Sequence, residues 1–127
     1  MPVEGGQMAS TVAMSDSILT SIKKQLNIAD SFTAFDSDII LLINSALSAL
    51  HQIGVGPDEG FSIEDNTATW SEFIDDARLN MVFQEVYLRV RITFDPPTGT
   101  VLGSMENTLK ELDWRLSVAA EEVNADE

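Results

Sequence analysis

Apolar residues recur at helical spacing along most of the chain. Ile18, Ile22 and Leu26 lie four residues apart, which predicts a short amphipathic helix over residues 15–27. Residues 36–54 contain an unbroken run of five apolar residues and further apolar positions beyond it, which predicts a second helix buried over most of its circumference. The cover for that helix can come from the chain's own core or from a neighbouring subunit, and the pattern alone does not separate the two.

Polar residues mark both ends of the first predicted helix. Ser15 and Asp16 can cap its start, because a side-chain oxygen there can accept a hydrogen bond from a free backbone N–H. Lys23 and Lys24 fall in its last turn, where positive charge complements the helix dipole. We expect both lysines to lie at a solvated helix end.

The second half of the chain predicts three further helices. The apolar pattern gives a short helix over residues 71–77, a longer helix that ends at Phe94, and a last helix whose expected N-cap is Ser104. Pro96 and Pro97 stop the longer helix, since proline has no backbone N–H and biases the residue before it away from helix. The expected fold class is therefore mainly α, a small bundle of about four to five helices.

An acidic, glycine-containing segment lies between the second and third predicted helices. A loop of this length is uncommon unless it carries function or structure of its own, and residues 61–70 could form a short β-hairpin. We expect this long loop or short hairpin to be a docking element; the alternative is a solvated loop that caps the core with Phe61 and Trp70. The expected docking residues are Pro57, Asp58, Glu59, Phe61, Ile63, Glu64 and Asp65.

The length of 127 residues fits one domain. We expect an N-terminal arm over residues 1–14, a single helical domain over residues 15–123, and an acidic C-terminal tail over residues 124–127. The first residues lack the features of a signal peptide, and no window is apolar enough to span a membrane. We therefore expect a protein made in the cytoplasm, with no membrane partner.

The sequence offers little for catalysis or cofactor binding. It has no cysteine, and its one histidine, His51, has no Ser or Asp at a recognised motif spacing, so we expect a structural or exposed role for it. Neither a Gly-rich phosphate loop nor the spacing of a calcium loop occurs, and the acidic segment would at most hold calcium weakly. The expectation is a protein that is not an enzyme and has no cofactor and no metal site.

The net charge of −14 disfavours direct nucleic-acid binding, because binding phosphates normally requires a basic patch. Arg89 and Arg91 stand out against this acidic background. Glu85 lies one turn before Arg89, so a helix-surface ion pair is one interpretation of these arginines. A contact with an acidic neighbouring subunit is the other.

Several short motifs are similar to those of a known family. They are Gly54-Val55-Gly56-Pro57, Gly60-Phe61-Ser62-Ile63, Thr67-Ala68-Thr69-Trp70, Tyr87-Leu88-Arg89-Val90-Arg91, Phe94-Asp95-Pro96-Pro97 and Glu111-Leu112-Asp113-Trp114-Arg115-Leu116. In that order, from about Met14 to Val118, the chain resembles the head-tail connector (adaptor, head-completion) proteins of long-tailed bacteriophages. Residues 1–13 lie outside this resemblance.

The resemblance implies a virion protein whose helical subunits assemble as a homo-oligomeric ring, a dodecamer, beneath the portal protein. Such a ring extends the DNA channel and joins the head to downstream connector, stopper or tail proteins. DNA would pass through without specific binding, since an acidic wall neutralises no phosphate. With this pattern we expect subunit contacts at Arg89 and Arg91, and docking through the acidic loop and through a tail that includes Ala119, Ala120 and Val123.

A second interpretation comes from another class of protein, an acidic DNA-mimic inhibitor of a host DNA-binding protein. It would share the negative charge and the lack of catalytic motifs. Such an inhibitor would act as a free monomer or dimer and compete with DNA, whereas a connector belongs in the purified virion.

Overall fold

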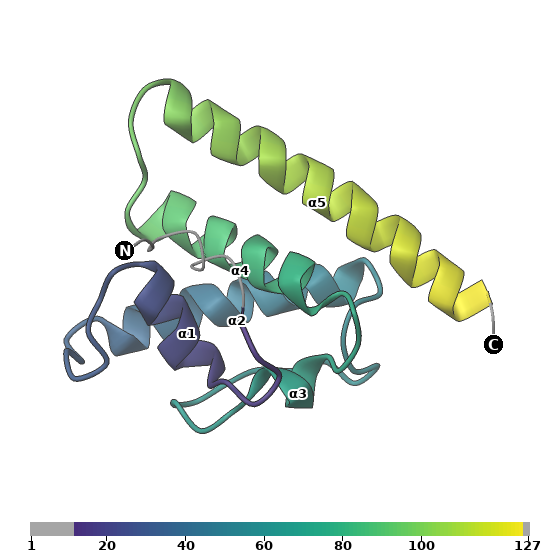
Figure 1. Cartoon of the computed structure of the whole chain (residues 1–127), viewed down its shortest axis with the longest axis horizontal. Coiled ribbons are helices and arrows are strands. Elements are labelled where there is room, and N and C mark those ends of the chain that lie inside the picture. Colours follow the sequence, from purple (N-terminus) through teal and green to yellow (C-terminus); the bar gives the residue numbers. More distant parts are fainter. Residues whose placement is uncertain (1–11, 126–127) are drawn as a thin grey trace, which may run out of the picture.

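The computed structural model describes the backbone of residues 12–125 and the side chains of residues 12–122. Within this part of the chain the fold is mainly α, as the sequence predicts (Figure 1). Its helices are α1 (Ile18–Gln25), α2 (Asp36–Gln52), α3 (Trp70–Phe73), α4 (Leu79–Phe94) and α5 (Thr100–Ala125). The long helix α5 runs along one side of the bundle, and α1, α3 and the connecting loops lie on the other side (Figure 1).

The core forms where α2 packs on α4 and α1 covers them both. Ile39, Ile43 and Leu47 of α2 have no exposed surface, so one face of the apolar run is covered within the chain. Leu41, from the same run, is 68% exposed. The chain's own core therefore covers one face of this helix, whose burial over most of its circumference the pattern predicts, and leaves Leu41 outside that cover.

Residues just before α1 pair with residues just before α3. The backbone N–H of Ile18 donates to the carbonyl of Ala68, and the N–H of Trp70 donates to the carbonyl of Asp16. Ser17, one residue after the predicted caps, is the N-cap of α1 and accepts from the N–H of Thr20 at 3.1 Å. These bonds tie the start of the described chain to the end of the acidic loop.

The described structure has no β-strand in the loop between α2 and α3. Ser17 and Thr69 form an isolated antiparallel bridge, so the hairpin alternative for residues 61–70 is wrong and the long-loop alternative holds. Asn44 of α2 replaces the missing strand partner, because its amide oxygen accepts from the N–H of Ile63 at 2.8 Å and its amide nitrogen donates to the carbonyl of Ile63 at 3.0 Å.

Helix α5 begins at Thr100, five residues earlier than an N-cap at Ser104 predicts. Ser104 is therefore not its N-cap but an interior residue, and its carbonyl accepts from the hydroxyl of Thr108 at 3.0 Å. The turn before the helix is made by Gly99, whose φ of 65° suits glycine. The helix also continues through Asn124 and Ala125, into the predicted acidic tail.

The predicted boundary between arm and domain falls on residues that pack. Val12 and Met14 are half-buried against the core. Met14 also accepts a hydrogen bond from the N–H of Ser71 through its carbonyl. The rest of the predicted arm, residues 1–11, lies outside the described residues.

Candidate functional site

Arg89, a predicted subunit contact, joins α4 to α5 inside the chain. Its Nε donates to Glu85 Oε2 at 2.8 Å, and its Nη2 donates to Asp113 Oδ2 at 2.9 Å and to Oδ1 at 3.1 Å. Its side chain is 31% exposed. The structure thus contains the ion pair with Glu85 that the sequence indicates, and adds an inter-helix partner that helical spacing does not reveal.

Glu85 is the buried member of this cluster. Its side chain has no exposed surface, and its Oε1 has no hydrogen-bond partner among the described residues. Burial and, after it, the neighbouring Asp113 carboxyl raise the pKa of Glu85, Arg89 lowers it, and the net pKa is about 8. A protonated Glu85 can donate to Asp113, which gives the free oxygen a partner and leaves one negative charge for one arginine.

Arg91, the other predicted subunit contact, also binds within the chain. Its Nε donates to the carbonyl of Asp95 at 2.5 Å, and its Nη1 donates to the hydroxyl of Tyr87 at 3.1 Å. The Asp95 carboxylate lies 3.8 Å from the same guanidinium. These contacts join residues of the last turns of α4 to Asp95, just after the helix. Both arginines therefore form hydrogen bonds within the chain and do not require a second subunit as a partner.

The predicted docking loop divides into anchored and free residues. Ile63 is only 3% exposed and belongs to the core, while the half-buried Phe61 ring lies 5.7 Å from the ring of Phe73. Pro57 is half-buried. The acidic residues are exposed: Asp58, Glu59, Glu64 and Asp65. Ile63 therefore holds the loop in place, and the carboxylates are what the loop presents.

Asp65 is held in a local turn. Its Oδ1 accepts from the backbone N–H of Thr67 at 2.9 Å and from the Thr67 hydroxyl at 2.6 Å. These two hydrogen bonds lower the pKa of Asp65, because they favour the charged form. The tip of the loop therefore keeps a fixed negative charge.

The predicted docking tail is only partly available. Ala120 is 2% exposed and packs in the core, and Ala119 is half-buried. The side chain of Val123 lies outside the described residues. The end of α5 is thus used at least partly to hold this helix on the bundle.

The sequence interpretation missed Trp114, which is 67% exposed on α5. The signal was present in the helical spacing. Leu112 and Leu116 face the bundle, and at 100° per residue Trp114 points about 200° away from Leu112. A large exposed aromatic residue in the middle of a long helix is a frequent contact residue in protein interfaces.

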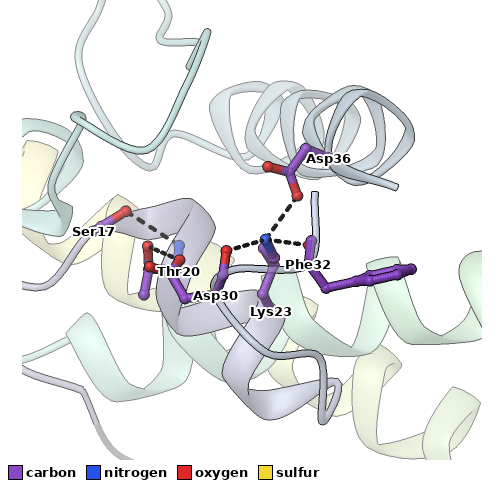
Figure 2. A network of polar contacts seen from close by, with 6 residues as sticks. All are labelled: Ser17, Thr20, Lys23, Asp30, Phe32 and Asp36. Carbon is purple, nitrogen blue, oxygen red and sulfur yellow. Dashed lines mark hydrogen bonds and ion pairs between the residues drawn. The ribbon is translucent and has the colours of Figure 1, made fainter. Parts of the chain in front are cut away.

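Lys23 also differs from expectation. It is 1% exposed rather than solvated, and its Nζ lies 2.8 Å from Asp36 Oδ1 (Figure 2). The same ammonium donates to the carbonyls of Asp30 at 3.1 Å and Phe32 at 2.8 Å. A lysine is almost never buried without such partners. Lys24, by contrast, is exposed as expected.

The described residues hold no group of three or more His, Asp or Glu side chains arranged to bind a metal ion. His51 is exposed in the last turn of α2. In the same part of the chain, no helix combines the length and the apolar character needed to cross a membrane.

Comparison with known families gives a match over most of the chain. The profile of the family described as phage connector protein matches residues 18–123, which is most of the chain and contains all five described helices apart from the end of α5. Comparisons with curated proteins and with solved structures found no match. The match agrees with the resemblance seen in the motifs, and the helical fold agrees with it too. The chain belongs to the phage connector protein family.

Proposed function

We propose that this phage connector protein is a head-tail adaptor subunit, which forms a ring beneath the portal, extends the DNA channel and joins the head to the tail. Family membership supports the structural role in the virion. The ring, the dodecameric state and the position beneath the portal are the proposal.

The observation that carries the proposal is the uneven packing of α5. Toward its C-terminal end, Leu112, Leu116 and Ala120 are buried at 5% exposure or less. Toward its start, the residues of the same seam are only half-buried: Leu102, Met105 and Leu109. A helix of 26 residues that is packed along part of its length leaves apolar surface for another subunit.

Two hollows lie where the first half of α5 stands away from the bundle. One of about 240 Å³ is lined by residues that include Leu42, Ile92 and Leu109. The other, of about 520 Å³, is lined by residues that include Arg89 and Lys110. With the exposed Trp114 on the outer face, α5 presents two different surfaces, which is what a head-to-tail ring requires of each subunit.

The charge of the described surface supports passage of DNA without binding. Five of the seven Lys and Arg residues form ion pairs within the chain, and only Lys24 and Lys110 have none among residues 12–122. Few cations therefore remain to neutralise phosphate groups. In this proposal the exposed carboxylates of the loop, Asp58, Glu59, Glu64 and Asp65, dock to the portal or to a downstream protein.

In this proposal the two arginines contribute to subunit contacts only through the part of each side chain that is exposed. Arg89 and Arg91 are 31% and 27% exposed, so each could touch a neighbouring subunit while retaining its internal partners. Ala119 and Val123 remain proposed tail contacts, and Ala120 serves the chain's own packing.

Electron microscopy of the purified protein over a concentration series, alone and with purified portal protein, tests the proposal. Closed rings with a central hole are expected, either alone or on the portal. A protein that stays monomeric in both conditions, and is absent from purified virions, would contradict it. Such a protein that instead competed with DNA for a basic host protein would be a DNA mimic.

A further inference from the structure

Three phenylalanine rings form a contiguous surface at one end of α2 and α4. Phe32 and Phe35 are 48% and 44% exposed, and their ring centroids lie 5.5 Å apart in an edge-to-face arrangement. Phe35 makes a similar contact with the half-buried Phe94, at 5.4 Å. We call Phe32, Phe35 and Phe94 the aromatic patch. Single exposed apolar residues are ordinary on a protein surface, but a connected group of three rings is not.

The backbone beneath the aromatic patch is fixed by Lys23. Its buried ammonium binds the carbonyls of Asp30 and Phe32 and the carboxylate of Asp36, so one side chain holds the connection between α1 and α2 at three points. Figure 2 shows the Phe32 ring pointing away from this polar cluster. A rigid backbone keeps the rings in position before any partner arrives, which lowers the entropy lost on binding.

Carboxylates adjoin the aromatic patch along the chain. Asp36 follows Phe35, the exposed Asp38 lies one turn after Phe35 on α2, and the exposed Asp95 follows Phe94. The two cations in contact with them, Lys23 and Arg91, are already in ion pairs with Asp36 and Asp95. The surface therefore combines exposed aromatic area with a negative rim.

We propose that the aromatic patch docks an apolar segment flanked by lysine or arginine on a protein other than this one. The negative charge beside the rings favours a basic partner, because lysine or arginine side chains would be attracted to the carboxylates. The same cations can also lie over the faces of the aromatic rings. A second copy of this chain fits poorly, since only Lys24 and Lys110 lack an ion pair among the described side chains. The proposal does not depend on ring formation.

Binding of a defined probe to the full-length protein tests this surface. The probe is a fluorescein-labelled peptide of alternating Lys and Leu blocks, compared with a Glu and Leu peptide of the same length, and the readout is fluorescence anisotropy. Phe32→Ser with Phe35→Ser is the test variant. Leu41→Ser with Val101→Ser is the matched control, because these two residues are similarly exposed but lie outside the patch.

The Lys and Leu peptide is expected to bind the wild-type protein, and the test variant should weaken it about tenfold while the control pair changes it little. Asp38→Asn with Asp95→Asn, which leaves the rings in place, should weaken it a few-fold at low salt and less at high salt. Equal losses in test and control variants would overturn the proposal, as would equal binding of the Glu and Leu peptide. Self-association that disappears in the test variant would assign the patch to a second copy and also overturn it.

Discussion

Arg89 on α4 and Asp113 on α5 are joined by two hydrogen bonds from one guanidinium nitrogen, at 2.9 and 3.1 Å. Glu85 accepts from the Nε of the same guanidinium at 2.8 Å. The contact lies beside the half of α5 that is least well packed. It therefore anchors α5 next to Leu112, where the well-packed half of the helix begins.

Asp113→Asn removes the charge of this contact and keeps its shape. We expect a loss of about 1 kcal/mol in the free energy of unfolding, because the pair is partly exposed and screened by solvent. Faster amide hydrogen exchange in the first half of α5 should accompany the loss. Glu111→Gln, which breaks the exposed pair with Arg115, is the control and should change stability by under about 0.5 kcal/mol.

Stability should fall as the pH rises from about 4.5 to about 8. The pKa of Glu85 in the folded protein is about 8, above its ordinary value of 4.5, so the folded state binds the extra proton between these values. The contribution of Glu85 is complete below the lower pKa and is lost as the pH rises to the upper one, with an upper limit of about 5 kcal/mol at about 1.4 kcal/mol per pKa unit. Urea unfolding of the wild type and of Glu85→Gln checks this, because the variant should show a flatter dependence. If the free energy of unfolding changes with pH in the same way for the two proteins, the pH dependence comes from a group other than Glu85.

Lys23→Met should destabilise the fold, whereas Lys24→Met should not. The first variant removes the partner of Asp36 and of two carbonyls, at an expected cost of about 2–3 kcal/mol after allowance for the partial exposure of Asp36. The second alters an exposed side chain and should stay within about 0.5 kcal/mol. Chemical unfolding of the pair measures the difference, and equal stabilities would show that the buried contacts contribute nothing net.

Gly56→Ala should be more harmful than Gly60→Ala. Both glycines have positive φ angles, 96° and 88°, so both variants carry backbone strain of about 1 kcal/mol. Only at Gly56 would the new methyl group also meet the ring of Phe73, whereas nothing lies within 4 Å at Gly60. We expect the Gly56 variant to lose roughly 1–3 kcal/mol more than the Gly60 variant in thermal unfolding. A smaller or reversed difference would mean that the Phe73 ring moves aside freely.

Trp114→Ser should reduce assembly without reducing the stability of the monomer. The side chain is 67% exposed, so the fold gains little from it, while an interface that buries a tryptophan commonly loses about 2 kcal/mol or more on its removal. The concentration at which rings or other oligomers form, measured by analytical ultracentrifugation, should rise at least about tenfold. Leu41→Ser, at a similarly exposed residue on α2, is the matched control, and an equal effect of the two would argue against a specific role for Trp114.

The strongest sequence signals predicted the helices well. Helix α2 begins at Asp36 and α4 ends at Phe94, as expected, because acidic residues favour the first turn and Pro96 and Pro97 stop the chain from continuing as helix. The start of α5 was missed. Gly103 lowers helix propensity by about 1 kcal/mol relative to alanine, so the turn before Ser104 gives a weak local signal that packing overrides.

Contacts between distant residues were not predictable from spacing. Lys23 looks like a helix-end charge in the sequence, and its burial depends on residues 27–35 folding back over α1 after Asn27, whose φ is 68°. Arg89 was correctly paired with Glu85 four residues away, but Asp113 lies 24 residues further along the chain. The loop between α2 and α3 was recognised by composition, while its anchoring through Asn44 and Ile63 required the fold.

Because α5 is firmly packed only along its C-terminal half, its N-terminal half can change direction about that anchored part. Its firmly held region begins near Leu112, so about 18 Å of helix extends from there back to Thr100 at 1.5 Å per residue. A tilt of about 10° around that point moves the first turn by about 3 Å over this length. A rotation of this size would displace the first turn enough to accommodate a mismatch between a subunit and its partner, without a change in the packing of Leu112, Leu116 and Ala120.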